Sequence, residues 1–225
     1  MSRKTILASG EFYHLYNRGT EKRKIFMDKT DYERFLALLY LCNSTLDVRI
    51  DNVKQASQQG STLLEKTFQM DRGNTLIDLN AYCLMPNHFH ILAHEHTEGG
   101  ISRFMQKLTT AYTMYFNTRY KRMGALFQGK YRAEHAKSDR YLKYLISYIH
   151  LNPIKLVESK WKETGIKNKI AAKEYLRRYR YSSFLDYGGH QREEIRIITR
   201  DSLPRYFETP KGFTDSVTEW LSYRS

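Results

Sequence analysis

The stretch LIDLNAYCLMPNHFHILA, residues 76–93, decides the fold of this 225-residue chain. Two apolar segments stand on either side of Met85-Pro86-Asn87, and a proline cannot serve inside a central strand. The sequence therefore predicts a strand at 76–84, a turn, and a second strand at 88–93 that pairs with the first as a hairpin.

On both sides of this hairpin, apolar residues recur at the spacings typical of strands and helices. Thr30, with Glu33 three residues later, predicts a capping box at the start of a helix. The order strand, helix, strand, strand, helix, strand, helix is typical of an α+β fold. We expect a ferredoxin-like sandwich, an antiparallel sheet with helices on one face, followed by a C-terminal extension. The other expected strands lie at 12–17 and 126–136, and the helices at 31–41, 101–122 and 140–152.

Two segments fall outside this pattern. The polar stretch 51–74 is interpreted as an insertion or long loop with a helical turn at 63–68. After residue 157 the chain becomes basic, and no topology can be derived for its end, although a short helix is expected at 170–178. The predicted organisation is one domain at 1–157 that contains the insertion, then a basic linker and C-terminal extension at 158–225.

Charge is the main signal in the composition. The chain has 37 Lys and Arg against 24 Asp and Glu, a formal net charge of +13 and a pI near 9.6. Between Ser102 and Arg180 stand 19 basic and 5 acidic residues. Such a balance favours a polyanionic partner, through neutralisation of phosphates and release of counterions. Aromatic residues make up 14% of the chain, and rings among the cations can stack on bases. A basic protein without such a partner is the alternative.

The cysteine content and the lack of long apolar segments bear on the cellular compartment of the protein. Cys42 and Cys83 are far apart and form no CxxC pair, so a reduced, cytoplasmic protein is expected. Residues 1–10 lack the apolar core of a signal peptide. No run of 18 apolar residues occurs, so we expect no membrane span.

Two short segments carry residues capable of chemistry. His88 and His90 alternate on one strand, so they project from the same face about 7 Å apart and can converge on one divalent metal. Taken alone, the pair fits ordinary surface histidines better than a metal site. In YIHLNP, residues 148–153, Tyr148 and Asn152 lie four apart and share a helix face. A core ring and a helix cap are the alternative interpretation of those two.

Together, several ordered blocks resemble the HUH single-tyrosine transposases, specifically the REP-associated tyrosine transposases. The resemblance covers about residues 12 to 185. It departs from the family in the long stretch 51–74 and in the tail beyond about residue 190. The blocks are YHLYNRG at 13–19 with IFMDKTDYERFL after it, MPNHFHIL at 85–92, LFQGKYR at 126–132, YIHLNP at 148–153, and a later RYSSF that includes Tyr181.

The resemblance implies roles for four residues. His88 and His90 would be the HUH metal ligands, Asn152 a polar third ligand, and Tyr148 the nucleophile that forms a 5′-phosphotyrosine with single-stranded DNA beside a hairpin, REP-like element. The implied cofactor is Mg²⁺ or Mn²⁺, although imidazole ligands also tolerate Zn²⁺. His14 is expected to flank the metal site without binding the metal itself, with an ordinary packed histidine as the equal alternative.

DNA binding is assigned to the basic segments. A catalytically inactive protein that binds DNA hairpins is the alternative function, and a ferredoxin-like RNA-binding protein is a third. Monomer and homodimer, and an active site formed in cis or in trans, stay open. The candidate DNA-binding residues are Arg18, Arg103, Lys107, Arg119, Lys121, Arg122, Lys130 and Arg132.

Overall fold

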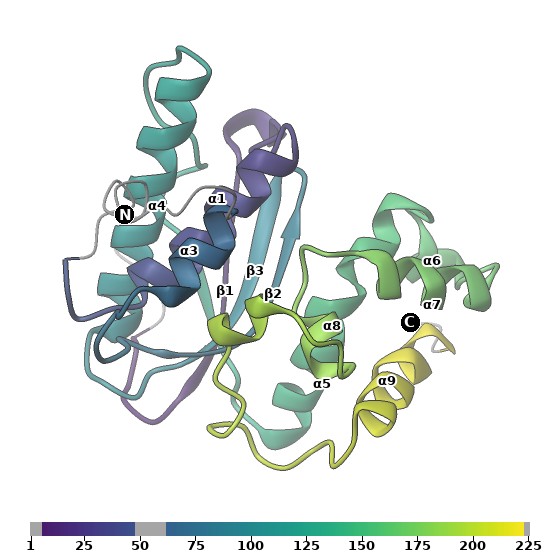
Figure 1. The fold of residues 1–225 in the computed structure, drawn as a ribbon. Coiled ribbons are helices and arrows are strands. Elements are labelled where there is room, and N and C mark those ends of the chain that lie inside the picture. The colour runs from purple at the N-terminus through teal and green to yellow at the C-terminus, as the bar shows by residue number, and fades with distance from the viewer. Residues whose placement is uncertain (1–5, 48–61, 223–225) are drawn as a thin grey trace.

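The computed structural model describes residues 6–47 and 62–222 (Figure 1). Four strands and two long helices form the first part of the chain, and short helices follow a third long helix. The elements are β1 (Phe12–Arg18), η1 (Thr20–Lys22), α1 (Lys29–Cys42), α3 (Leu63–Gln69), β2 (Asp78–Met85), β3 (His88–His94), α4 (Gly100–Arg119), β4 (Arg132–His135), α5 (Asp139–Leu151), η2 (Asn152–Leu156), α6 (Trp161–Thr164), α7 (Lys169–Arg178), α8 (Phe184–Tyr187), η3 (Glu193–Ile197), α9 (Pro210–Glu219) and η4 (Trp220–Ser222).

The four strands form one antiparallel sheet in the order β2-β3-β1-β4. The hairpin predicted from residues 76–93 is confirmed, because Met85 pairs with His88 directly across the turn. An element order of βαββαβ with the first and third strands in the centre is the ferredoxin-like arrangement. The α+β class and the antiparallel sheet are therefore confirmed.

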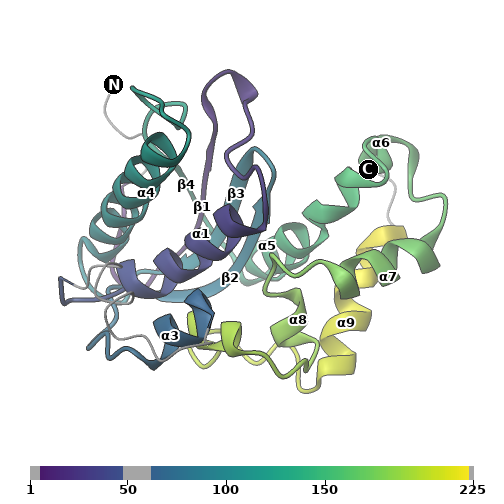
Figure 2. The same ribbon diagram turned by 45° about the horizontal axis from the view of Figure 1, so that its top comes forward.

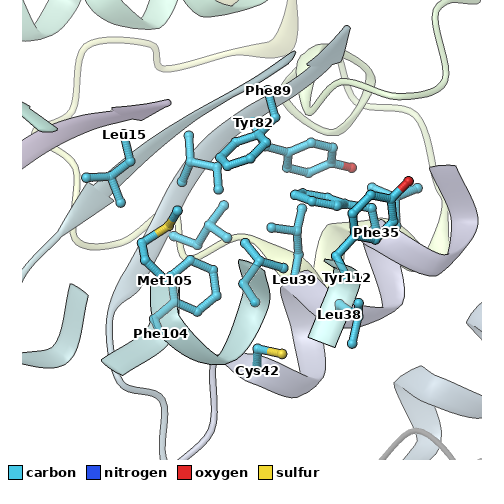
Figure 3. Close-up of a cluster of buried hydrophobic side chains, with 14 of the residues drawn as sticks. Leu15, Phe35, Leu38, Leu39, Cys42, Tyr82, Phe89, Phe104, Met105 and Tyr112 are labelled. Atoms are coloured by element: carbon cyan, nitrogen blue, oxygen red, sulfur yellow. The ribbon is translucent and has the colours of Figure 1, made fainter. Parts of the chain in front are cut away.

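Helices α1 and α4 cover one face of the sheet and bury the larger core with it (Figure 3). Leu15 of β1 and Phe89 of β3 point into this layer because alternate residues of a strand share a face. Phe35 of α1 and Tyr112 of α4 meet them, and their rings lie 4.8 Å apart edge to face. Complete burial of each such side chain stabilises the fold by about 1.5–3 kcal/mol.

The opposite face is covered as well, by α5 and the C-terminal segment (Figure 2). Cys83 and Leu92 face this second core, where they meet Ile149 of α5, while Phe184 and Phe213 pack behind the helix. The expectation of helices on one face thus holds for α1 and α4 and misses this second layer. The spacing of Leu145 and Ile149 gives α5 an apolar side, but spacing alone does not say which face of the sheet that side covers.

Local signals at two element ends were misinterpreted. Helix α1 begins at Lys29 and its cap is Asp28, whose Oδ1 accepts from Asp31 N at 3.3 Å, so the capping box at Thr30 is wrong. Asp28 is also bound by Arg119, a contact that local sequence cannot reveal. The strand predicted at 126–136 is shorter in the structure, where β4 spans Arg132–His135. Gly129 adopts a left-handed φ of 74° and interrupts the extended backbone before it.

The predicted insertion at 51–74 lies partly outside the described residues, which exclude 48–61. Its helical turn at 63–68 is confirmed by α3. That helix has the capping box that α1 lacks: Glu65 N donates to Thr62 Oγ1 and Thr62 N donates to Glu65 Oε2. The helix predicted at 170–178 is confirmed as α7.

Candidate active site

Four of the rings on the sheet face toward α5 form the candidate site, and all four come from the two central strands. His14 and Tyr16 come from β1, and His88 and His90 come from β3, because alternate residues share a face. The ring centroids of His88 and His90 lie 5.0 Å apart with the rings at 89°. Those of His14 and His90 are also 5.0 Å apart and stacked. The two histidines of the HxH pair are thus side by side, as their spacing predicted.

Tyr148 reaches this face from α5 of the same chain. Its ring centroid lies 5.6 Å from that of His90 and 5.8 Å from that of His14, edge to face in both cases. Leu145 and Ile149 of α5 are buried in the second core, and this packing sets the rotation of the helix. The apolar face of α5 therefore directs the half-buried phenol toward the histidines.

Asn152 lies buried at the end of α5, one helical turn after Tyr148. Its Nδ2 donates to the carbonyl oxygen of Tyr148 at 2.8 Å, and its Oδ1 accepts from Lys155 Nζ at 3.1 Å. The amide is thus fixed with its oxygen toward a positive charge. The ammonium of Lys155 also lies 5.8 Å from the centroid of the Tyr148 ring.

His88 and His90 each make a hydrogen-bond contact through the ring nitrogen Nδ1. His90 Nδ1 lies 2.9 Å from His14 Nε2, and His88 Nδ1 lies 2.6 Å from Asn87 Oδ1. Burial lowers the pKa of His14 and of His88 to about 4, and Lys155 and Arg18 add to the shift of His88. Both rings are therefore neutral at neutral pH, which is the form that binds metal ions.

Three residues of this face were missed by the sequence reasoning. Lys155 follows Asn152 by three positions, and burial followed by the charge of Arg18 lowers the pKa of its ammonium. Tyr16 donates through its hydroxyl to Glu134 Oε1 at 2.5 Å. The signal was alternation: Tyr16 stands two residues after His14, and Glu134 pairs with His14 across β1 and β4.

A cavity of about 420 Å³ opens beside His88. Among the described residues, no lining side chain is acidic, so the cavity concentrates positive charge at one end of the sheet. Such a hollow is suited to an anion. Its charged and aromatic lining comprises Arg18, Lys130, Arg132, Lys155, His88 and Tyr16.

The structure separates the predicted DNA-binding residues into groups. Arg18, Lys130 and Arg132 line the cavity. The other predicted cations lie on or after α4, where Arg103 and Lys121 are exposed. Three of them contact the protein itself: Lys107 Nζ donates to the carbonyls of Ser44 and Leu46, Arg119 pairs with Asp28 and Asp31, and Arg122 donates to Asn117 Oδ1.

The side chains that would bind the implied metal can be compared with the ligands that divalent cations prefer. Within residues 6–47 and 62–222, no group of three or more His, Cys, Asp or Glu side chains is placed to hold a metal ion. The candidate donors are instead the imidazoles of His88 and His90, whose ring centroids lie 5.0 Å apart, and the amide oxygen of Asn152. This mixture fits a divalent cation with positions left for phosphate or water. The Asn152 oxygen already faces a cation, the ammonium of Lys155.

A sheet that places an HxH pair against a helix-borne tyrosine is the arrangement of single-tyrosine DNA-processing enzymes implied by the resemblance. Residues 55–152 match the family described as "Transposase IS200 like". This segment is therefore similar to the family that the ordered sequence blocks resemble. It runs from before α3 to the first residue of η2 and contains His88, His90, Tyr148 and Asn152.

Two further comparisons complete these findings. A solved structure of a REP-associated tyrosine transposase bound to a REP hairpin has a TM-score of 0.49 and 12% sequence identity, over 86% of this chain and 90% of that chain. The comparison with curated proteins finds no match. In the described part of the chain, no helix has both the length and the apolar character needed to cross a bilayer.

Proposed function

We propose that this protein is a metal-dependent transposase that cleaves and rejoins single-stranded DNA beside hairpin, REP-like elements. Tyr148 is the nucleophile, and His88, His90 and Asn152 hold the metal. The observation that carries the proposal is the 5.6 Å between the ring centroids of Tyr148 and His90 within one chain. A phenol placed against His90, one of the proposed metal ligands, suits covalent catalysis on a phosphodiester.

The reaction is a transesterification. The Tyr148 oxygen forms a bond to phosphorus while the bond from phosphorus to the 3′ oxygen breaks. The phenol gives up its proton, and the departing 3′ oxygen takes up one. The product is a 5′-phosphotyrosine, in which the phosphodiester is conserved, so another 3′-hydroxyl can reverse the step without ATP.

The environment of Tyr148 explains why positive charge is needed there. Burial raises the pKa of the phenol, and Tyr144 and Glu134 add to the shift. A neutral phenol is a poor nucleophile, so its phenolate has to be stabilised by cations. Lys155 supplies one charge beside the ring. A divalent metal bound by His88, His90 and Asn152 would supply the second, by polarising a phosphoryl oxygen.

The cavity beside His88 is the proposed binding site of the DNA strand. Arg18, Lys130 and Arg132 face this hollow, and cations of this kind hold phosphates by charge and hydrogen bonds. The strand would enter along them and present one phosphate to Tyr148. Mg²⁺ and Mn²⁺ are the proposed cofactors, and the site is complete within one protomer.

The direct test is adduct formation on a hairpin oligonucleotide with a single-stranded flank and Mn²⁺. The natural protein is expected to give a covalent protein–DNA species on a denaturing gel, and Tyr148→Phe none. Tyr144→Phe is the matched control, because Tyr144 is a half-buried ring one turn earlier on α5. An adduct that persists in Tyr148→Phe refutes the nucleophile, and loss in Tyr144→Phe alone moves the role to that ring. Hairpin binding without any adduct identifies the inactive binding protein.

A further inference from the structure

The turn between β2 and β3 is held by the loop that follows β1. Gly19 N donates to the carbonyl of Asn87 at 2.9 Å, and Ile25 N and Phe26 N donate to that of Pro86 at 2.8 and 3.1 Å. A side chain at position 19 would clash, because its Cβ would stand 2.4 Å from the carbonyl oxygen of Arg23. The segment YHLYNRG, residues 13–19, thus ends in a glycine that supports the residue preceding His88.

The same loop fixes which way the Asn87 amide points. Asn87 Nδ2 donates to the carbonyl oxygen of Lys22 at 3.0 Å. That carbonyl is presented by an unusual backbone, since Glu21 and Lys22 both have left-handed φ values, 57° and 62°. An amide nitrogen only donates and a carbonyl only accepts, so the oxygen of Asn87 is the atom that faces His88.

The orientation of the amide decides the protonation of the histidine. Asn87 Oδ1 lies 2.6 Å from His88 Nδ1 and can only accept, so Nδ1 carries the hydrogen. A neutral imidazole has one protonated nitrogen, which leaves the lone pair of His88 on Nε2. If nothing held Nδ1–H, the ring could equally adopt the form with hydrogen on Nε2, which cannot bind a metal through that atom.

We propose that Asn87 is a positioning residue that fixes the tautomer and ring orientation of His88, so that Nε2 is the nitrogen offered to the metal. The inference rests on the proposed function, which makes His88 a ligand. Outer partners of this kind usually change metal affinity by about 10–100-fold when they are removed. A turn residue that only stabilised the hairpin would leave metal affinity unchanged wherever the fold persists.

The test combines two readouts on DNA-free protein. Long-range ¹H–¹⁵N NMR of the metal-free protein reports the tautomer of His88, expected with hydrogen on Nδ1 in the natural chain and not fixed in Asn87→Ala. Calorimetric titration with Mn²⁺ is expected to show affinity about 10–100-fold weaker in Asn87→Ala. Asn87→Asp keeps an oxygen acceptor at His88 and is expected to restore both the tautomer and most of the affinity.

The matched control is Asp78→Asn. Asp78 Oδ2 lies 2.9 Å from His94 Nδ1 on the same pair of strands, at the end away from the site, so its loss should leave Mn²⁺ affinity unchanged. The inference is overturned if hydrogen is found on Nε2 in the natural protein, or if Asn87→Ala keeps both the tautomer and the affinity. If the natural protein has the Nδ1–H form but binds no Mn²⁺, the proposed metal dependence is wrong. The assignment of the His88 tautomer would still hold in that case.

Discussion

Replacing Asp31 with alanine is expected to destabilise the fold more than any surface change. The Asp31 carboxylate is fully buried between α1 and α4 and accepts four hydrogen bonds. Met27 N, Tyr115 Oη and Tyr120 Oη donate to it at 2.8 Å each, and Arg119 Nη1 donates at 2.6 Å. This single side chain joins the start of α1 to the last turn of α4.

The magnitude follows from what the substitution leaves behind. Removing one partner of a buried ion pair costs about 3–5 kcal/mol, because the other charged and polar groups lose their partner without regaining full hydration. Water reaches Arg119, whose side chain is 30% exposed, so the lower half of that range is the better expectation. For a chain of this length, about 2–4 °C per kcal/mol gives a fall in Tm of roughly 6–16 °C.

Urea unfolding followed by circular dichroism measures this change directly. The matched control is Asp47→Ala, because Asp47 also pairs with a cation of α4, Lys107 at 4.0 Å, but is fully exposed. An exposed pair contributes about 0–1 kcal/mol, so this variant should unfold close to the natural protein. If Asp31→Ala loses less than about 1 kcal/mol with an unchanged m-value, the buried network does not have the role assigned to it.

The same network bears on DNA binding. Because Arg119 is engaged by Asp28 and Asp31, Arg119→Gln should lower stability and leave the salt dependence of DNA affinity unchanged. The interpretation of Arg119 as a DNA-binding residue stays a prediction until that slope is measured. A slope reduced by about one phosphate contact would show that the guanidinium leaves its ion pair to bind DNA.

Three further experiments give distinct outcomes. Arg132→Gln, in the cavity, should reduce the slope of log affinity against log salt by about 1, and an unchanged slope places the DNA elsewhere. Tyr112→Phe removes a buried hydroxyl that donates to the carbonyl of Ile25 at 2.5 Å and should cost about 1–3 kcal/mol in urea unfolding; a neutral result refutes that bond. An equal mixture of Tyr148→Phe and His90→Ala should form no adduct, because each ring meets the other in its own chain; restored activity indicates a site shared between protomers.

The central part of the fold could be predicted from the sequence because its signals are local. The alternation that placed His88 and His90 on one face depends only on strand geometry, and Pro86 fixed where the hairpin turns. Tyr148 lies on the predicted helix, and Asn152 lies at its C-terminal cap, one turn further along the chain. That the helix would lie over the histidines came from the resemblance and not from periodicity, since no local pattern says which face a helix covers.

What the sequence could not predict depends on contacts between distant residues. The sequence does not show whether a basic side chain faces solvent or a carbonyl group. Lys107, which binds a carbonyl, could therefore not be distinguished from Arg132, which lines the cavity. Lys155 looked like one of many basic residues of the linker until its ammonium was placed at Asn152. Asp28, the cap of α1, also accepts a hydrogen bond from Arg119, 91 positions away, and the apparent capping box at Thr30 was a coincidence of spacing.

The C-terminal segment is part of what fixes the nucleophile. Within YIHLNP, Tyr148 faces the strands, while His150, two residues on and about 200° around the helix, faces the other way. His150 Nδ1 donates to the carbonyl of Ile146 at 2.8 Å, so its Nε2 accepts from the hydroxyl of Ser183 at 2.8 Å. Ser183 in turn accepts from Tyr82 N at 2.9 Å, on the edge strand β2. The RYSSF block therefore joins the back of α5 to the sheet, and a helix held on that side can turn Tyr148 away from the histidines only by breaking a buried chain of hydrogen bonds.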